Sequence, residues 1–201
     1  PERHTFEGPL AGKMKSAGQA LPGIEVCIMD ENNQRVDYGV VGEVCMRGPN
    51  IMKGYRNMEE QTANTIIDGW LHTGDGGYID DEGFVFIVDR VKDMIISGGE
   101  NVYSAEVENA LYQHEAVSQC AVIGIPHEKW GESVHAIVVL KEGATSDEAE
   151  LIEHCKSLIA SFKCPRSVSF QSEPLPLSGA GKILKTELRK AYWKEGERNV
   201  N

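Results

Sequence analysis

The sequence has 201 residues, enough for one domain or two small ones, and its hydrophobic and charged fractions of 41% and 25% are ordinary for a globular protein. The formal net charge of −11 argues against a nucleic-acid partner. No stretch approaches the roughly 18 apolar residues that a membrane-spanning helix requires. The five cysteines show no C-x-x-C pair or metal-ligand spacing, so we expect reduced structural thiols in a cytoplasmic protein and no metal site.

Residues 1–90 are rich in turns and short strands. Apolar and polar residues alternate at 24–28, and a second apolar run covers 40–46, so strands are expected at both places. A short helix is expected at 59–67. Residues 70–75 (WLHTGD) are expected to form a tight loop, and residues 78–88 a hairpin with an acidic turn that contains glycine.

The pattern changes after about residue 91. Ser104 is expected to cap one helix, and the capping box of Thr145 and Glu148 is expected to open another, which Pro165 stops. Further elements are expected as strands at 120–125, 134–140 and 168–170 and as a last helix at 184–194. Together they predict an α+β unit with a short sheet, about three helices and a small core of its own.

The segment 70–75 carries the first candidate site residue. Asp75 lies between glycines, and a carboxylate on a tight loop can accept two hydrogen bonds from a vicinal diol such as that of a ribose. An Asx-turn or a helix cap explains the same residue without any ligand.

The segment 89–102 (DRVKDMIISGGENV) lies where one pattern gives way to the other, so it is the natural hinge. Gly98 and Gly99 permit positive φ angles and let a ligand approach the backbone closely. A surface ion-pair cluster and a plain β-turn are the alternatives for its charges and its glycines.

The segment 174–183 (PLPLSGAGKI) superficially suggests a phosphate-binding Walker A loop. The match fails because Pro176 replaces the first glycine and Ile183 replaces the Mg-binding Ser or Thr. What remains is Lys182 on a glycine-rich loop, where its amine could neutralise developing phosphate charge. The alternative is a flexible surface loop.

Taken together in this order, these segments resemble the ANL superfamily of adenylate-forming enzymes, which includes acyl-CoA and aryl-CoA synthetases, peptide-synthetase adenylation domains and luciferases. The resemblance covers essentially the whole chain. Each motif is weak alone, but several in the correct order are specific. The matching segments are 16–23, 42–43, 54–55, 70–75, 89–102 and 181–182.

The resemblance implies a reaction in which a carboxylate attacks the α-phosphate of ATP to give an acyl-adenylate and pyrophosphate. Asp75 and Arg90 match the contacts to the nucleotide ribose. Lys182 matches the lysine that bridges the acyl carboxylate and the α-phosphate. Lys92 matches the hinge about which a small domain swings between the half-reactions.

The resemblance also assigns a site for CoA, the acceptor of the acyl group. Gly98 and Gly99 match the loop that lines the pantetheine tunnel, and Trp130 is placed beside it. Lys163 and Arg166, in a locally basic stretch, are candidates for the CoA phosphates. A solvated basic face is the alternative for these two.

The domains expected from the resemblance are the C-terminal β-rich portion of an AMP-binding domain at 1–90 and a mobile C-terminal lid at 91–201. The phosphate loop and the segment that supplies the Mg²⁺-binding acid are absent from the sequence, so these parts are expected upstream. Pro1 is neither an initiator Met nor part of a signal peptide, so we expect a piece of a longer enzyme. Because the phosphate loop and that acid are missing, we expect this piece to be inactive alone.

The function expected is that of an ATP-dependent, AMP-forming acid–CoA ligase. Its reactants would be a carboxylic acid, ATP and CoA, with Mg²⁺ as cofactor and a medium- or long-chain fatty acid as the first choice of acid. The alternatives are an adenylation domain that loads a carrier protein and an aryl-CoA ligase of the coumarate type. A homo-oligomer and peripheral contact with a membrane are left open.

Overall fold

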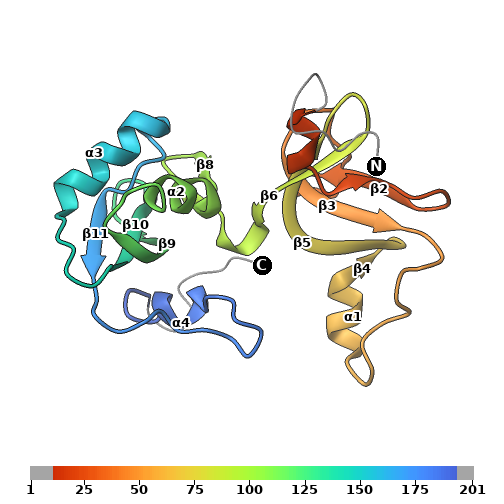
Figure 1. Ribbon diagram of the computed structural model, residues 1–201. Coiled ribbons are helices and arrows are strands. Elements are labelled where there is room, and N and C mark those ends of the chain that lie inside the picture. The colour runs from red at the N-terminus through yellow and green to blue at the C-terminus, as the bar shows by residue number, and fades with distance from the viewer. Residues whose placement is uncertain (1–10, 194–201) are drawn as a thin grey trace. The chain divides into compact units, whose positions relative to one another are not determined.

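The computed structural model describes residues 11–193. The chain divides into two compact units, residues 1–91 and 92–201, so Val91 belongs to the first unit. Each unit has its own sheet (Figure 1).

The first unit is built on one mixed-length antiparallel sheet. Within the described residues its strands run in the order β1-β6-β5-β3-β2, and β4 pairs with β5. A short 3₁₀ helix and one α-helix accompany the sheet. The bounds are η1 (Ala11–Lys15), β1 (Gly18–Gln19), β2 (Glu25–Met29), β3 (Gly42–Arg47), α1 (Glu59–Thr65), β4 (Ile66–Ile67), β5 (Trp70–Ile79) and β6 (Phe84–Arg90).

Alternating side chains give this sheet a small apolar cluster on each face. Cys27 and Cys45, which are cross-strand partners, pack with Met29 and Trp70. The intervening residues, Ile28 among them, pack on a second cluster. Successive side chains of a strand point to opposite faces, so this division follows from the sequence alternation that predicts β2 and β3.

The expectation of a tight loop at 70–75 is wrong. These residues are the first part of the long strand β5, because Leu71 and His72 pair with Met46 and Cys45 of β3 while Ile67 pairs with Trp70. The glycines at 74, 76 and 77 favour a loop by composition. In the structure they lie within β5 and allow it to depart from regular strand geometry. Figure 1 shows that β5 is curved.

The second unit holds a five-stranded sheet in the described part of the chain, in the order β11-β10-β7-β8 with β9 paired to β10. The β10–β11 pair is parallel and the other pairs are antiparallel. The short helix η2 precedes it at the boundary between the units. The bounds are η2 (Val91–Asp93), β7 (Ile95–Ser97), β8 (Glu100–Val102), α2 (Ser104–Leu111), β9 (Val117–His127), β10 (Gly131–Leu140), α3 (Glu148–Leu158), β11 (Ser167–Phe170) and α4 (Lys185–Arg189).

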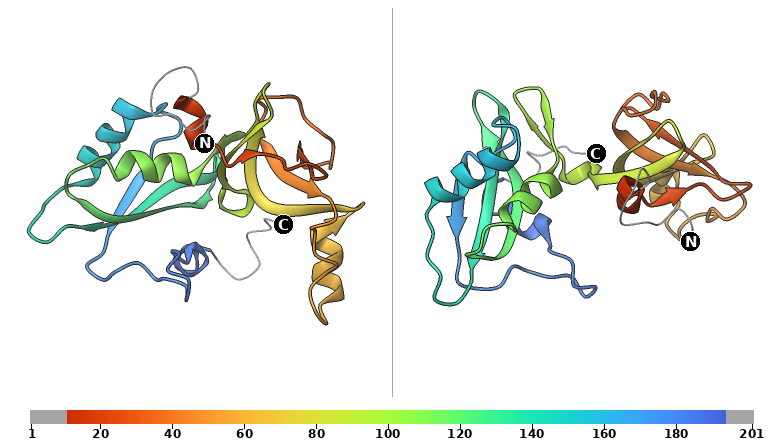
Figure 2. Two further views of the ribbon diagram at one scale, coloured as in Figure 1. Left: turned by 45° about the vertical axis from the view of Figure 1, so that its right-hand side comes forward. Right: turned by 45° about the horizontal axis from the view of Figure 1, so that its top comes forward.

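The central strands of this sheet are covered on both faces. Val122 and Ala136 belong to the main core cluster, which includes residues of α2 and α3, whereas Ile123 and Ile137 pack with Leu175 and the α4 segment. Figures 1 and 2 show α2 and α3 on one side of the sheet and α4 on the other. Burial on both faces explains why the strand at 120–125 reads as a continuous apolar run.

Two helix starts differ from expectation. Asp147, not Thr145, caps α3, because its carboxylate accepts the backbone N–H of Glu150. Ser104 is the first residue of α2, and the N-cap position before it is Tyr103. The buried hydroxyl of Ser104 accepts a hydrogen bond from Lys185. Both helices begin near the expected place.

Two helix ends also differ. The helix opened at residue 148 ends at Leu158, well before Pro165, and the last helix covers only Lys185–Arg189. The end of the segment expected to be helical at 184–194 reaches Lys194, which lies outside the described residues.

The α+β class and the three α-helices expected after residue 91 are confirmed within the described residues. Among residues 11–193, no helix has the length and apolar character needed to cross a membrane.

Candidate functional site

Asp75 and Arg90, the two residues expected at the nucleotide ribose, lie side by side. They are cross-strand partners on β5 and β6, and Arg90 Nε is 3.2 Å from Asp75 Oδ1. Both side chains are partly exposed, at 35% for Asp75 and 48% for Arg90. Both side chains are therefore partly accessible to a ligand.

The backbone around Asp75 deviates from regular pairing with β3. Glu43 pairs with Gly76 and Cys45 pairs with His72, so the one residue between them on β3 faces three residues on β5. This irregularity of the ladder contains Thr73, Gly74 and Asp75, and Gly74 has a φ of +71°. Such bulges re-aim side chains, and they are common next to active sites.

Two side chains bond the backbone where the ladder is interrupted. Glu43 Oε1 accepts the N–H of Gly74 at 2.8 Å, and Thr73 Oγ1 accepts the N–H of Asp75 at 3.1 Å. The Thr73 hydroxyl in turn donates to the carbonyl of Val44 at 2.8 Å. The strand segment that carries Asp75 is therefore fixed by specific polar contacts.

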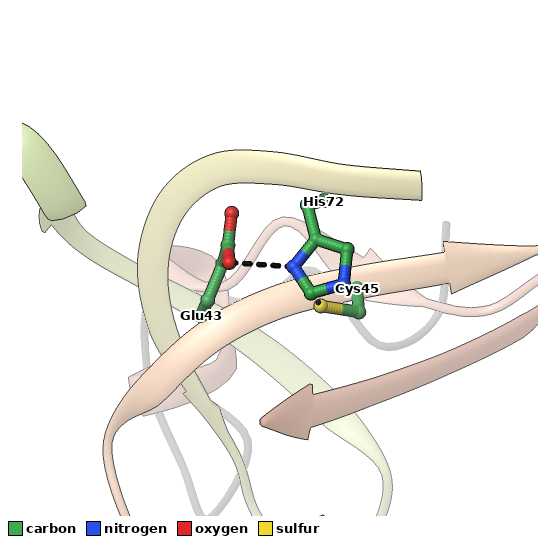
Figure 3. A group of neighbouring side chains, drawn as sticks. All are labelled: Glu43, Cys45 and His72. Carbon is green, nitrogen blue, oxygen red and sulfur yellow. Dashed lines mark hydrogen bonds and ion pairs between the residues drawn. The ribbon is translucent and has the colours of Figure 1, made fainter. Parts of the chain in front are cut away.

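Glu43 also contacts His72, as Figure 3 shows. Its Oε2 lies 2.8 Å from His72 Nδ1, and Cys45 Sγ lies 3.5 Å from the same nitrogen. Sequence reasoning placed residue 43 in a matching segment but gave it no role. Its partners are 29 and 31 residues away, so only the strand register brings them together.

A hollow of about 280 Å³ opens beside this segment in the first unit. Its lining includes the polar residues Thr73 and Asp75 and is otherwise mainly apolar, with Val44, Val85 and Ile87 among its members. A mostly apolar hollow with a few polar groups is typical of a small-molecule site.

Lys92, the expected hinge residue, is the first residue of the second unit and lies in η2. Its side chain is exposed. The next residue, Asp93, is held by Arg189 of α4, whose guanidinium donates to Asp93 Oδ1 at 2.8 Å in a largely buried pair. The chain is thus anchored in the second unit immediately after Lys92.

Gly98 and Gly99 form the tight turn between β7 and β8, with φ angles of +64° and +86°. The N–H of Gly98 donates to the carbonyl of Trp130 at 2.9 Å, and a Cβ at position 98 would lie 3.1 Å from the Trp130 ring. The structure therefore brings together Gly98 and Trp130, two of the three residues expected at the CoA site.

Trp130 is surrounded by cationic groups. The Arg166 guanidinium lies 3.8 Å from the centre of its ring, and the Lys129 amine lies 5.1 Å from it. Lys163, the other basic candidate, is paired with Glu106 at 2.7 Å. Of the two basic residues proposed from the sequence, Arg166 is therefore the one that contacts Trp130.

Glu132 supports this turn and was missed by sequence reasoning. Its carboxylate is largely buried, and it accepts the N–H of Ile96 at 3.2 Å. A Cβ at Gly124 would lie only 2.4 Å from Glu132 Oε2, so glycine at position 124 makes room for that carboxylate.

Lys182 lies on a loop whose backbone is well defined by internal bonds. Ser178 N–H donates to the Lys182 carbonyl at 2.7 Å, and Lys182 N–H donates to Ser178 Oγ at 3.1 Å. Gly181 has a φ of +76°, which closes the turn. The Lys182 side chain is exposed, and its amine has no ion-pair partner among the described residues.

The five cysteines are free and buried. Burial raises the pKa values of Cys45, Cys120 and Cys155 to about 12, which keeps these thiols protonated at neutral pH. These three cysteines are therefore poor nucleophiles.

Two family descriptions match the chain, and together they cover more than half of it. Residues 5–56 match the AMP-binding enzyme family, and residues 106–182 match the AMP-binding enzyme C-terminal domain. The resemblance inferred from the sequence is confirmed by both.

Similar proteins point the same way. The chain is 42% identical over its full length to the fatty acid–[acyl-carrier-protein] ligase ScoC of Streptomyces coeruleorubidus, of which it spans 38%. It is 50% identical to a long-chain-fatty-acid–CoA ligase of Bacillus subtilis over 147 residues, which are 73% of this chain and 26% of that protein.

A solved structure shares the fold. The o-succinylbenzoate CoA synthetase MenE of Bacillus subtilis, solved with the acyl-adenylate intermediate OSB-AMP, is 39% identical, with a TM-score of 0.82 over 89% of this chain and 36% of that one. The chain therefore belongs to the family of adenylate-forming AMP-binding enzymes and contains that family's C-terminal domain.

Proposed function

We propose that this chain is part of an ATP-dependent acid–CoA ligase that forms AMP. In the first half-reaction, a carboxylate oxygen attacks the α-phosphorus of ATP, and pyrophosphate leaves as the acyl–phosphate bond forms. In the second, the thiol of CoA attacks the acyl carbonyl, loses its proton, and AMP leaves. A medium- or long-chain fatty acid is the proposed substrate.

The observation that carries this proposal is the state of Lys182. Its exposed amine has no ion-pair partner among the described residues, while its backbone is fixed by Ser178. An exposed amine on such a bonded loop can stabilise the negative charge that develops between a carboxylate and a phosphate. We assign Lys182 this role in the first half-reaction.

The proposed ribose contacts are Asp75 and Arg90. The carboxylate of Asp75 can accept hydrogen bonds from the ribose hydroxyls, and Arg90 holds that carboxylate from the neighbouring strand. The hollow lined by Asp75 and Thr73 lies beside this pair and is proposed as part of the nucleotide site.

The proposed acceptor site lies in the second unit. The turn at Gly98 and Gly99 carries no side chain, which leaves its backbone open to the pantetheine arm of CoA. Trp130 supports this turn, and Arg166 above its ring offers a cation for CoA phosphates. Lys92 is proposed as the hinge between the two half-reactions.

The similar proteins support two alternatives to the proposed fatty-acid–CoA reaction. ScoC is named as a ligase for an acyl-carrier protein, which favours a carrier's pantetheine arm as acceptor. MenE is named for an aryl acid, o-succinylbenzoate, which favours an aryl substrate. The Bacillus subtilis long-chain ligase supports the fatty acid and CoA.

Magnesium is the cofactor expected for ATP, and it prefers oxygen ligands. Within residues 11–193, the group of three metal-ligand side chains is Glu43, Cys45 and His72, which offers sulfur and nitrogen besides a carboxylate. This group does not fit magnesium, and none of the roles above depends on the ion.

The test is an assay of the intact protein that carries this chain, with ATP, CoA and a panel of fatty and aryl acids. We expect AMP, pyrophosphate and acyl-CoA to form in equal amounts, and only with an acid present. If ADP and phosphate appeared instead, the proposed reaction would be wrong. Adenylate formation without CoA acylation, together with acylation of a carrier protein, would favour the carrier alternative.

A further inference from the structure

The interruption in the pairing of β3 with β5 raises the question of what holds Asp75. The N–H of Gly74 donates to the Glu43 carboxylate of β3, and the N–H of Asp75 donates to the Thr73 hydroxyl. A side chain that replaces a ladder bond can also set the direction of the neighbouring residue.

Glu43 can hold the segment that carries Asp75 because each of its two carboxylate oxygens contacts a residue of β5. One accepts the Gly74 N–H and the other contacts His72 Nδ1, both at 2.8 Å. These contacts join the carboxylate to His72, immediately before the irregular segment, and to Gly74 within it. Figure 3 shows β5 bending around Glu43 and His72.

The side chains of Glu43, His72 and Cys45 are buried to a degree that is typical of hydrogen bonds within the protein. The exposed fraction of the side chain is 9% for His72 and 24% for Glu43, and Cys45 is fully buried. Hydrogen bonds that involve a charged carboxylate in such partly buried places are stronger than those between neutral groups.

A transition metal is the other occupant that this group suggests, because sulfur, nitrogen and oxygen atoms converge there. His72 Nδ1, the nitrogen nearest the Cys45 sulfur, already contacts Glu43 Oε2 at 2.8 Å. Both Glu43 oxygens are also engaged. The hydrogen-bonded role is therefore favoured.

We propose that Glu43 is a positioning residue, which sets the orientation of the Asp75 carboxylate toward the ribose hydroxyls through its bond to Gly74. The inference rests on the proposed function and deepens it. Glu43 does not touch the nucleotide; it acts only through the backbone of residues 73–75. Thr73 is the second support, through its bond to the Asp75 N–H.

The test compares nucleotides with and without ribose hydroxyls in the adenylation half-reaction of the intact enzyme, measured as pyrophosphate exchange. With ATP, Glu43→Ala should lower kcat/KM for the nucleotide by about tenfold or more, which corresponds to one charge-assisted hydrogen bond. With 2′,3′-dideoxy-ATP, the same variant should match the wild type within about twofold, since Asp75 then has no hydroxyl to bind.

Glu43→Gln and Thr73→Val extend the test. Gln keeps an oxygen that can accept the Gly74 N–H, so it should restore most of the ATP-specific loss. Thr73→Val keeps the shape of the side chain but removes the oxygen that accepts the Asp75 N–H. It should lower kcat/KM for ATP as Glu43→Ala does, and leave kcat/KM for 2′,3′-dideoxy-ATP unchanged. Glu25→Ala is the matched control, because it removes a carboxylate from β2 of the same sheet, where its bonded partner is Arg47.

Equal losses with both nucleotides in Glu43→Ala and Thr73→Val would overturn the inference, because a general loss of structure does not depend on the ribose. Amide hydrogen exchange at Gly74 gives an independent readout. It should accelerate in Glu43→Ala and stay slow in Glu25→Ala; an unchanged rate would also contradict the inference. If the wild-type enzyme formed no acyl-adenylate, the proposed function itself would be wrong, whatever the role of Glu43.

Discussion

Gly98 shows how much a single residue controls in the second unit. Its φ of +64° is unfavourable for other residues, and any Cβ would lie 3.1 Å from the ring of Trp130. A side chain at this position must therefore displace the ring or the turn, and with it the surface that we assign to the pantetheine arm.

We predict that Gly98→Leu lowers the rate of thioester formation by about a hundredfold or more, because a small misplacement of a reacting group is costly. Adenylation should stay within about threefold of the wild type, since Lys182 is untouched. The two half-reactions are measured separately, by pyrophosphate exchange and by transfer from supplied acyl-adenylate.

Gly143→Ala is the control for this prediction. Gly143 has a φ of +75°, but nothing lies within 4 Å of a Cβ there, so it isolates the backbone strain alone. If both half-reactions fell equally in Gly98→Leu, the assignment of this turn to the acceptor site would be contradicted.

At the residue scale, the sequence is sufficient to identify site residues that lie in segments of unusual composition. Asp75, Gly98, Gly99 and Lys182 all stand in glycine-rich segments, so they can be found without a structure. Glu43 is different, because its contacts depend on which residue of β5 faces which residue of β3. A register that contains an irregularity is not readable from periodicity.

At the scale of elements, the buried side chain of His135 connects the sheet of the second unit to Tyr192, which follows α4. His135 of β10 contacts Ser167 at 2.7 Å and Ser169 at 3.1 Å on β11, and the hydroxyl of Tyr192 lies 2.9 Å from its Nε2. The carboxylate of Glu148, at the start of α3, interacts electrostatically with the His135 ring. Burial lowers the pKa of His135 below its usual value of 6.5, and Glu148 opposes this shift.

The lowered pKa predicts how stability depends on pH. In the unfolded chain His135 gains its proton below about pH 6.5, whereas in the folded protein it stays neutral to lower pH, so the unfolded state binds more protons in that window. The contribution of His135 to the free energy of unfolding should be constant near pH 7 to 8. It should then fall as the pH drops below about 6.5, by at most about 1.4 kcal/mol per pH unit from this residue.

Urea denaturation at several pH values between 5 and 8 measures this slope in the wild type and in His135→Gln. The difference between the two proteins should shrink as the pH falls, because the variant cannot gain a proton at this position. A difference that is independent of pH would show that His135 does not titrate as proposed. Comparing the two proteins removes the contribution of the other histidines.

Most strands and helices were predictable at this scale because burial imposes periodicity on them. Strands β2, β3, β9 and β10 lie where alternation or apolar runs place them. The strand character of residues 70–75 was not predictable, since its glycines favour a loop locally and only the pairing with β3 and β4 makes it a strand. Tertiary pairing here overrides local propensity.

At the scale of the whole molecule, the chain consists of two units with separate cores, and the proposed functional groups are divided between them. Asp75 and Arg90 belong to the unit 1–91, whereas Gly98, Gly99, Trp130 and Lys182 belong to the unit 92–201. The chain spans only 38% of ScoC and 36% of MenE. The complete reaction is therefore proposed for a larger protein.

We predict that the isolated chain of 201 residues does not catalyse exchange of pyrophosphate into ATP. Its sequence lacks the phosphate loop and the Mg-binding acid that the family resemblance leads us to expect. The measurement is pyrophosphate exchange with the acid panel, with the intact enzyme as positive control. Exchange above background by the isolated chain would show that its own residues suffice for adenylation.

The most direct measurement of the central claim is the effect of Lys182→Ala on the two half-reactions of the intact enzyme. Acyl-adenylate formation from ATP and acid should fall by about a hundredfold or more, as expected when a group that stabilises transition-state charge is removed. Thioester formation from supplied acyl-adenylate and CoA should stay within about threefold of the wild type. Unchanged adenylation in Lys182→Ala, with the protein folded, would contradict the account.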